Sequence, residues 1–407
     1  MMKHFTRNIT KCFYMLLAVP MLTACLVCCS ESSHIGPEIE PEKPDDNHDT
    51  NYPMSFAASD NSGVTTRATV TPLATNFMVS TYKNYTGGAK LVMDKYTAEY
   101  KQDLWNNVLH WDYTVVDGQY IKYWDYSNFP YRFHAIAPCP ANKDGFVLTA
   151  NQLTIPEGAD HIDYQTCTNG TISNQAAPKY YIAQVQRNNA STDTDKDIIT
   201  GETITYSAGN DLNRVVTLVF HHLTNKVRFG IYSTTPWTTA NKLYIKNFEA
   251  KVVSDNFITN ATGYTTSTTT GSFRDNGTFT GIIKGSKTLL TYTGGEGNEE
   301  CDLSKFQGQT SAFFFKCTDG LRQLPQNNVT VVVSFDLVQA DGTVFKHYEN
   351  VPVKYDDNNA ILNWNAGYLY TYYLVINEID KKLEVEFTAT LTPWENVSAE
   401  LSTDLEK

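Results

Sequence analysis

Alternation of apolar and polar residues recurs along most of the chain and predicts β-strands. The clearest segment lies near the C-terminus, where one face holds Leu383, Val385, Phe387, Ala389 and Leu391. Residues 131–137 and 226–231 alternate in a similar way, and residues 53–58 do so weakly. A period of two places successive side chains on opposite faces of a strand. No stretch longer than about two turns has convincing helical periodicity, so the pattern predicts an all-β protein.

Two further segments predict how strands are arranged. The odd-numbered positions from Val329 to Leu337 are apolar, and Asp341-Gly342 has the composition of a turn. Residues 344–353 then form a second predicted strand that runs back along the first. This combination predicts a β-hairpin. Residues 368–376 are apolar on both faces, which predicts a central strand covered on both sides.

The first residues have the layout of an export signal. Lys3, Arg7 and Lys11 precede a short apolar run at residues 12–19, which is followed by Leu22-Thr23-Ala24-Cys25. The run is too short for a spanning helix, and the last four residues look like a bacterial lipobox. We therefore predict a signal peptide at residues 1–24 and acylation of Cys25.

Cys29 is a rival acylation site, because a short polar and acidic segment follows it. With either cysteine the mature protein is expected to be exported and tethered by lipid. Residues 25–52 are rich in Pro, Glu and Asp and offer little to bury, so they predict a disordered linker.

Composition limits the classes of partner. The chain has 407 residues, of which 41% are hydrophobic, and its formal net charge is −12. The negative charge argues against nucleic acid and against electrostatic docking on anionic lipid. The length after the linker suits two domains, and polar residues 186–213 suggest a boundary that gives domains at 53–210 and 211–407.

Four of the eight cysteines lie beyond the signal region: Cys139, Cys167, Cys301 and Cys317. Proximity in sequence favours the pairs Cys301–Cys317 and Cys139–Cys167, but spacing leaves the connectivity open. No pair has the spacing of metal ligands. We expect neither a metal nor another cofactor.

No catalytic constellation emerges from the sequence. His221 and His222 are adjacent on a predicted strand, so they point to opposite faces and cannot chelate one ion alone. His110-Trp111-Asp112 lacks a neighbouring nucleophile, and none of the common hydrolase or phosphate-loop motifs is present. The protein is therefore expected not to be an enzyme. The Trp/Tyr-rich residues 105–124 are read either as core or as a sugar-stacking platform.

Arg67 lies among small residues in Thr65-Thr66-Arg67-Ala68-Thr69, between two predicted strands. Exposed loops of this composition are frequent sites of proteolysis. A solvated arginine is the alternative interpretation, and physical arguments alone favour it.

Several ordered segments together resemble the fimbrillin family, the lipoprotein precursors of surface fimbriae in Bacteroides-type bacteria. They are the lipobox ending in Cys25 and residues 66–69, 123–138, 218–229, 363–372 and 385–394. Each is weak singly, whereas the ordered set is fairly specific. The doubled His221-His222, where the family usually has one histidine, and the short C-terminal tail depart from the family pattern.

The resemblance implies two tandem transthyretin-like β-sandwich domains and a route of assembly. A lipoprotein precursor reaches the surface of the outer membrane, and a trypsin-like protease cuts between Arg67 and Ala68. The first strand, Pro53–Ser59, is then lost, and a C-terminal strand of another fimbrial subunit, matched here by Leu383–Leu391, fills the groove. An adhesion role is a further implication, and a place as stalk, tip or anchor stays open. The alternative function is a surface glycan-binding lipoprotein using residues 105–124.

Overall fold

The protein is described from a computed structural model. It describes residues 53–60, 76–84, 88–102, 109–114, 116–159, 164–173, 180–189, 194–199, 203–205, 215–237, 242–267, 277–294, 300–315, 317–353, 362–379 and 382–393. The predicted signal peptide and linker lie outside these residues.

Strands dominate the described residues, which confirms the all-β prediction. The helical element in this part of the chain is a three-residue 3₁₀ turn, Gln309–Ser311. No helix within the described ranges is long and apolar enough to cross a membrane.

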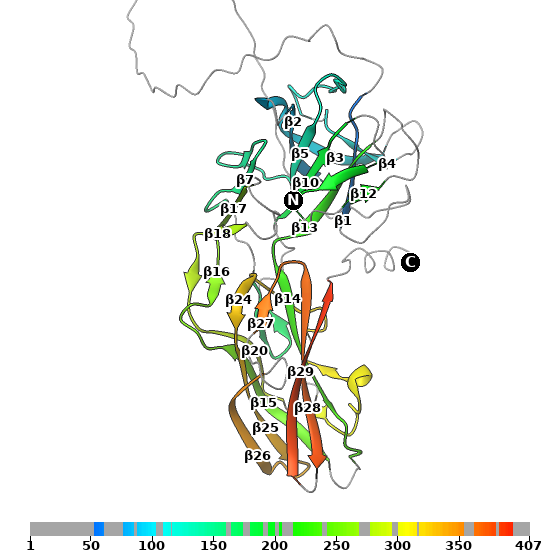
Figure 1. The fold of residues 1–407 in the computed structure, drawn as a ribbon. Helices are drawn as coiled ribbons and strands as arrows, with labels where there is room; N and C mark the ends of the chain where they lie inside the picture. The colour runs from blue at the N-terminus through cyan, green and yellow to red at the C-terminus, as the bar shows by residue number, and fades with distance from the viewer. Residues whose placement is uncertain are drawn as a thin grey trace, which may run out of the picture. The chain divides into compact units, whose positions relative to one another are not determined.

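A nine-stranded sheet gathers most of the N-terminal strands (Figure 1). Its main path runs β1 (Phe56–Asp60), β13 (Val216–His222), β10 (Tyr181–Arg187), β5 (Tyr131–Ala137), β2 (Asn76–Lys83), β3 (Lys90–Gln102) and β4 (Leu109–Asp112). Two short strands, β11 (Thr194–Asp197) and β12 (Thr203–Thr205), extend it from β10. Every residue of β5 is buried, because separate apolar clusters cover the two faces of the sheet.

Two sheets form a sandwich in the C-terminal half. The five-stranded sheet contains β22 (Phe313–Phe314), β14 (Asn225–Ser233), β28 (Tyr368–Ile379) and β29 (Lys382–Pro393), with β23 (Leu321–Gln323) also on β14. The seven-stranded sheet contains β26 (Val344–Pro352), β25 (Val331–Gln339), β15 (Leu243–Val252), β20 (Lys287–Tyr292), β8 (Cys167–Thr168) and β9 (Thr171–Ile172), with β21 (Cys301–Asp302) on β15. Phe229 on β14 meets Phe248 on β15 with 6.3 Å between ring centroids, inside the core that both sheets share.

Three smaller sheets complete the described strands. One contains β18 (Thr278–Thr280), β17 (Gly263–Ser267), β7 (Gln152–Ile155) and β6 (Val147–Leu148). The others pair β16 (Ile258–Asn260) with β19 (Ile283–Lys284), and β24 (Gln326–Val329) with β27 (Leu362–Trp364). Because β7 and β8 pair with strands of the C-terminal half, the two halves of the sequence interleave.

The two predictions about strand arrangement are confirmed. β25 and β26 pair antiparallel, and the turn between them uses Gly342 at φ 85°, a conformation that glycine adopts without steric cost. β28 is flanked by β14 and β29 and is buried on both faces, with Tyr373 and Leu374 at 7% and 3% exposure.

Strand pairing assigns β13 to the N-terminal sheet, although the sequence analysis placed it at the start of the second half. β13 pairs antiparallel with β10 and parallel with β1, whereas the next strand, β14, pairs with β28. The sheets therefore change between His222 and Asn225. The domain limits 53–210 and 211–407, and the tandem transthyretin-like arrangement, stay predictions.

Candidate functional site

β1 forms one edge of the nine-stranded sheet, and among the described strands it pairs with β13 alone. It runs parallel to β13, with Phe56 opposite Val216 and Asp60 opposite Phe220. This is the strand that the resemblance marks for removal, predicted at Pro53–Ser59. An edge strand can leave without breaking the rest of its sheet, and its departure exposes the unpaired backbone groups of its neighbour.

Backbone hydrogen bonds fix the start of this edge. Met54 N donates to Lys122 O at 2.7 Å, and Val216 N donates to Ser55 O at 2.8 Å. The buried hydroxyl of Tyr113 donates to Met54 O at 2.9 Å. Burial raises the pKa of Tyr113 to about 12, so the hydroxyl stays protonated as a donor at neutral pH.

Phe56 anchors the strand in an aromatic pocket. Its side chain is 5% exposed, and its ring centroid lies 6.0 Å from that of Phe77, 5.6 Å from Tyr113 and 5.9 Å from Phe133, all edge-on. Edge-on pairs at this spacing are favourable beyond simple burial. Phe56 therefore supplies much of the side-chain energy that holds β1.

Met54 precedes Phe56 on the same face and is 2% exposed. Beside it lies a shallow cavity of about 190 Å³, which Trp111, Tyr113 and Ile121 help to line. Pro53 and Met54 themselves form part of the lining of this cavity, together with the polar side chains of Asp112 and Thr114.

The connection after β1 suits a cut that frees it. β1 and β2 follow each other in sequence but are not neighbours in the sheet, since β13, β10 and β5 lie between them. Arg67 and Ala68 fall in this connection, outside the described residues. A break anywhere between Asp60 and Asn76 would leave β1 held to the rest of the fold by noncovalent contacts: its pairing with β13, the hydrogen bonds of Met54 and the packing of Phe56.

β29 forms an edge of the five-stranded sheet. It pairs antiparallel with β28 from Tyr368 opposite Pro393 to Ile379 opposite Lys382, and within the described strands it has no second partner. The predicted donor residues Leu383, Val385, Phe387, Ala389 and Leu391 all belong to it. Their side chains lie outside the described part of the structure, so this register is what the structure establishes for them.

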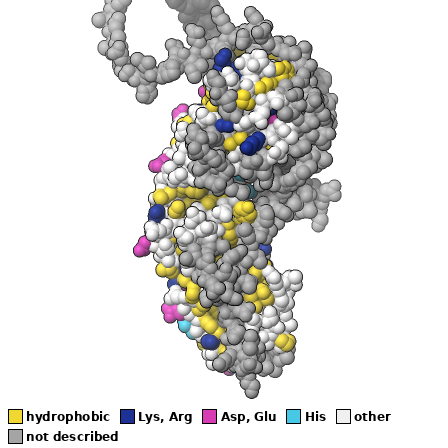
Figure 2. Space-filling model, in the orientation of Figure 1, with side chains coloured by type: hydrophobic (Ala, Val, Ile, Leu, Met, Phe, Trp, Pro, Cys, Tyr) yellow, Lys and Arg dark blue, Asp and Glu magenta, His cyan; other side chains and the backbone are white. Residues whose placement is uncertain are grey.

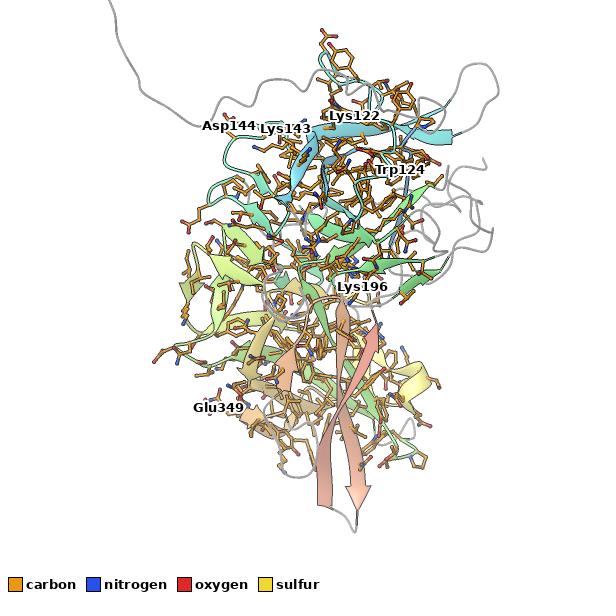
Figure 3. The ribbon with its side chains drawn as sticks, turned by 45° about the horizontal axis from the view of Figure 1, so that its top comes forward. Lys122, Trp124, Lys143, Asp144, Lys196 and Glu349 are labelled. Carbon is orange, nitrogen blue, oxygen red and sulfur yellow. The ribbon has the colours of Figure 1, made fainter. Side chains whose placement is uncertain are left out.

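The aromatic stretch 105–124 contributes mainly to the core. Trp111 and Trp124 are 9% and 1% exposed, and the Arg187 guanidinium lies over the Trp124 ring at 4.6 Å from its centroid. Figure 3 shows Trp124 among the side chains of the N-terminal strands. Tyr120, at 69% exposure, is the strongly exposed aromatic of the described part of this stretch. The buried tryptophans cannot stack on a sugar, which weakens the glycan-binding alternative.

The adjacent histidines diverge, as strand geometry requires. His221 Nε2 lies 2.7 Å from Asp197 Oδ2, whereas the His222 ring packs 4.7 Å from the Tyr181 ring, measured between centroids. The described residues contain no cluster of His, Cys, Asp or Glu that could hold a metal ion.

No disulfide joins the four cysteines of the folded part. Neither pair favoured by sequence proximity is bonded, and the thiols of Cys167 and Cys317 instead both approach the carbonyl oxygen of Phe315. The acylation candidates Cys25 and Cys29 lie outside the described residues.

Two features of the site are absent from the sequence analysis. The partner of β1 is β13, about 160 residues away, and no local pattern announces a pairing at that separation. Tyr113 was assigned only to an aromatic cluster, and its bond to Met54 O has no sequence signature. The sequence signal that does point to this site is the weak alternation at residues 53–58, which predicts the first strand.

No protein-family model matches the chain, and neither does any curated protein. Among solved structures, a fimbrial protein from Bacteroides vulgatus matches with 14% identity and a TM-score of 0.42, covering 84% of this chain and 99% of its own. A putative cell adhesion protein from Bacteroides uniformis matches with 14% identity and a TM-score of 0.38, covering 85% and 99%. One from Parabacteroides distasonis matches with 7% identity and a TM-score of 0.37, covering 85% and 97%.

Proposed function

We propose that this chain is a structural subunit of a cell-surface fimbria, exported as a lipoprotein precursor and assembled by strand exchange after proteolysis. The observation that supports this most directly is the position of β1. It is an edge strand, β13 is its single partner within the described part of the chain, and the segment containing Arg67 follows it in sequence. In the proposed route Cys25, or Cys29, carries the lipid that tethers the precursor to the outer membrane until the cut.

Loss of β1 would leave unpaired backbone groups and an empty side-chain pocket, and an incoming strand can fill both. The edge of β13 regains unpaired N–H and C=O groups, and the pocket of Phe56 opens between Phe77 and Phe133. Main-chain pairing supplies affinity in β-strand addition, and side-chain pockets supply specificity. Burying one large apolar side chain contributes about 1.5–3 kcal/mol.

The donor sequence matches the lost strand when both run in the same direction. Phe387 then replaces Phe56, Val385 replaces Met54, and Ala389 takes the place of Ala58. In the reverse direction, with Phe387 again in the pocket, Val385 would stand in the place of that alanine. The parallel register keeps a small residue where β1 has one, and it sets Leu391 opposite Phe220 in place of Asp60.

The surface outside this edge gives the mature subunit solubility. Figure 2 shows hydrophobic side chains interspersed with polar and charged ones on the visible face. The chain from Ala68 onward keeps an excess of acidic residues, which opposes nonspecific association of subunits. Association is therefore expected to depend on a specific strand rather than on a broad apolar face.

The test is proteolysis of the full precursor with a trypsin-like protease. The expected product begins at Ala68 and forms a ladder of oligomers that resists detergent. The variant Arg67→Gln should stay whole at this bond and stay monomeric, while Arg274→Gln, in another Thr-rich stretch, should behave as the wild type. Cleavage at Arg67 without any polymer, with residues 383–391 intact, would refute strand exchange.

A further inference from the structure

Cys167 and Cys317 lie side by side in the core of the C-terminal sandwich. Their side chains are 1% and 2% exposed. Both thiols approach the same carbonyl oxygen, Phe315 O, with sulfur–oxygen distances of 3.9 Å and 3.4 Å. Two buried thiols that converge on one carbonyl oxygen are neighbours in the core, as the two members of a disulfide must be.

The two residues come from different sheets and from distant parts of the chain. Cys167 begins β8, which pairs parallel with β20 in the seven-stranded sheet, and Cys317 follows β22 of the five-stranded sheet. β8 is only two residues long, so few ladder hydrogen bonds hold this N-terminal segment among the C-terminal strands. A covalent bond here would join the two sheets of the sandwich across their core.

We propose that Cys167 and Cys317 form a disulfide in the exported protein. The sulfur–sulfur bond forms by thiol–disulfide exchange with an oxidant that is itself a disulfide. One thiolate attacks this oxidant, the resulting mixed disulfide is attacked by the second thiolate, and the oxidant leaves as a dithiol that holds the two electrons and the two protons.

Both thiols are buried in the finished fold, so oxidation occurs while the sandwich closes. The thiolate is the reactive form of a cysteine, and the bond therefore forms while the two thiols can still lose a proton to solvent.

The disulfide would fix β8 covalently to the segment that follows β22. The bond closes a loop of about 150 residues, and in the chain-entropy model longer loops gain more stability from a cross-link. Secreted proteins keep such bonds, whereas thiols of cytosolic proteins stay reduced. The inference holds whether or not strand exchange occurs.

The test compares the full chain exported by its own signal with the same chain made without the signal in the cytosol. Each is denatured without reductant in the presence of an alkylating agent and mapped by peptide mass spectrometry. The exported protein should contain one linked pair of peptides, bearing Cys167 and Cys317, while Cys139 and Cys301 are alkylated. The cytosolic protein should have all four alkylated.

A stability measurement separates the cross-link from simple packing. Reductant should lower the thermal midpoint of the exported wild type and of the control Cys139→Ser by several degrees, and should leave Cys167→Ser and Cys317→Ser unchanged. Alkylation of all four cysteines in the exported protein, or a link between Cys317 and Cys301, overturns the proposal. This readout on the wild type does not depend on whether any variant folds.

Discussion

Replacing Phe56 with alanine separates the role of β1 in the precursor from its role in the polymer. Phe56 is 5% exposed and touches three aromatic rings of the acceptor pocket. In the precursor the ring fills that pocket. In the polymer proposed above residue 56 is gone, because the mature chain begins at Ala68.

The expected magnitude follows from burial. Phe→Ala in a packed core costs about 3–5 kcal/mol, which combines lost transfer energy with the cavity left behind. If β1 undocks locally, this whole cost falls on its docking equilibrium. Because about 1.4 kcal/mol is a factor of ten, the undocked fraction of β1 should rise by about two to three and a half powers of ten.

Two assays measure the two states. Thermal unfolding of the uncut precursor should show a lower midpoint for Phe56→Ala, and the bond after Arg67 should be cut faster. The temperature at which the cut, assembled polymer dissociates in detergent should be unchanged. Phe387→Ala should lower that temperature, because the pocket of Phe56 then stays empty. Phe345→Ala is the matched control, since this phenylalanine on β26 is 51% exposed and should alter neither assay.

The reasoning fails if Phe56→Ala weakens the polymer as much as the precursor. That result would mean that β1 remains in its groove after assembly. A precursor of unchanged stability would be equally damaging, because it would show that the buried ring does not hold the strand.

Two further substitutions probe the same region. Tyr113→Phe removes the hydroxyl that donates to Met54 O and should cost about 1–3 kcal/mol by leaving a buried carbonyl unpaired; we expect a lower precursor midpoint and faster cutting, with the exposed Tyr120→Phe as control. Burial opposes ionisation of Asp125, but hydrogen bonds from three neighbouring side chains outweigh it and lower its pKa. Because the pKa of Asp125 is lower in the folded state, its carboxylate stabilises the fold at pH values above the unfolded pKa near 3.8. This contribution is lost as the pH falls through the folded-state pKa. Asp125→Asn should therefore lower the midpoint at pH 7 and flatten its fall as the pH drops below the unfolded value near 3.8, whereas Asp144→Asn, in an exposed turn, should leave the midpoint at pH 7 unchanged.

The strands could be predicted where apolar and polar residues alternate along the chain, or where a run of residues is apolar throughout. Residues 383–391 and the hairpin around Gly342 were located because a period of two and a turn signal are local properties. β28 was predicted as central because only a strand covered on both faces tolerates apolar residues at every position. These features need no knowledge of distant parts of the chain.

Pairing between distant strands could not be predicted in this way. β13 has the same alternation whether it joins the sheet before it or the sheet after it, so its place beside β1 depends on tertiary packing. The same holds for Cys167, which sequence proximity pairs with Cys139 and the fold brings to Cys317. Local chemistry predicts a strand or a thiol, and only the topology selects its partner.

The geometry of β1 also orders the steps of the proposed assembly. An incoming β29 and the resident β1 need the same edge of β13 and the same aromatic pocket, so they exclude each other. Before the cut, an incoming donor strand would have to displace β1. Because β1 is then still covalently joined to its own sheet, its local concentration is high and it competes strongly with the donor. After the cut the strand that departs is diluted, and the competition favours the donor of the next subunit. In the proposed route, a subunit whose Arg67 stays uncut would keep β1 and its lipid and could still offer β29, so it would end the fibre at the membrane. Under that proposal, cleavage is the step that separates a stalk subunit from an anchor.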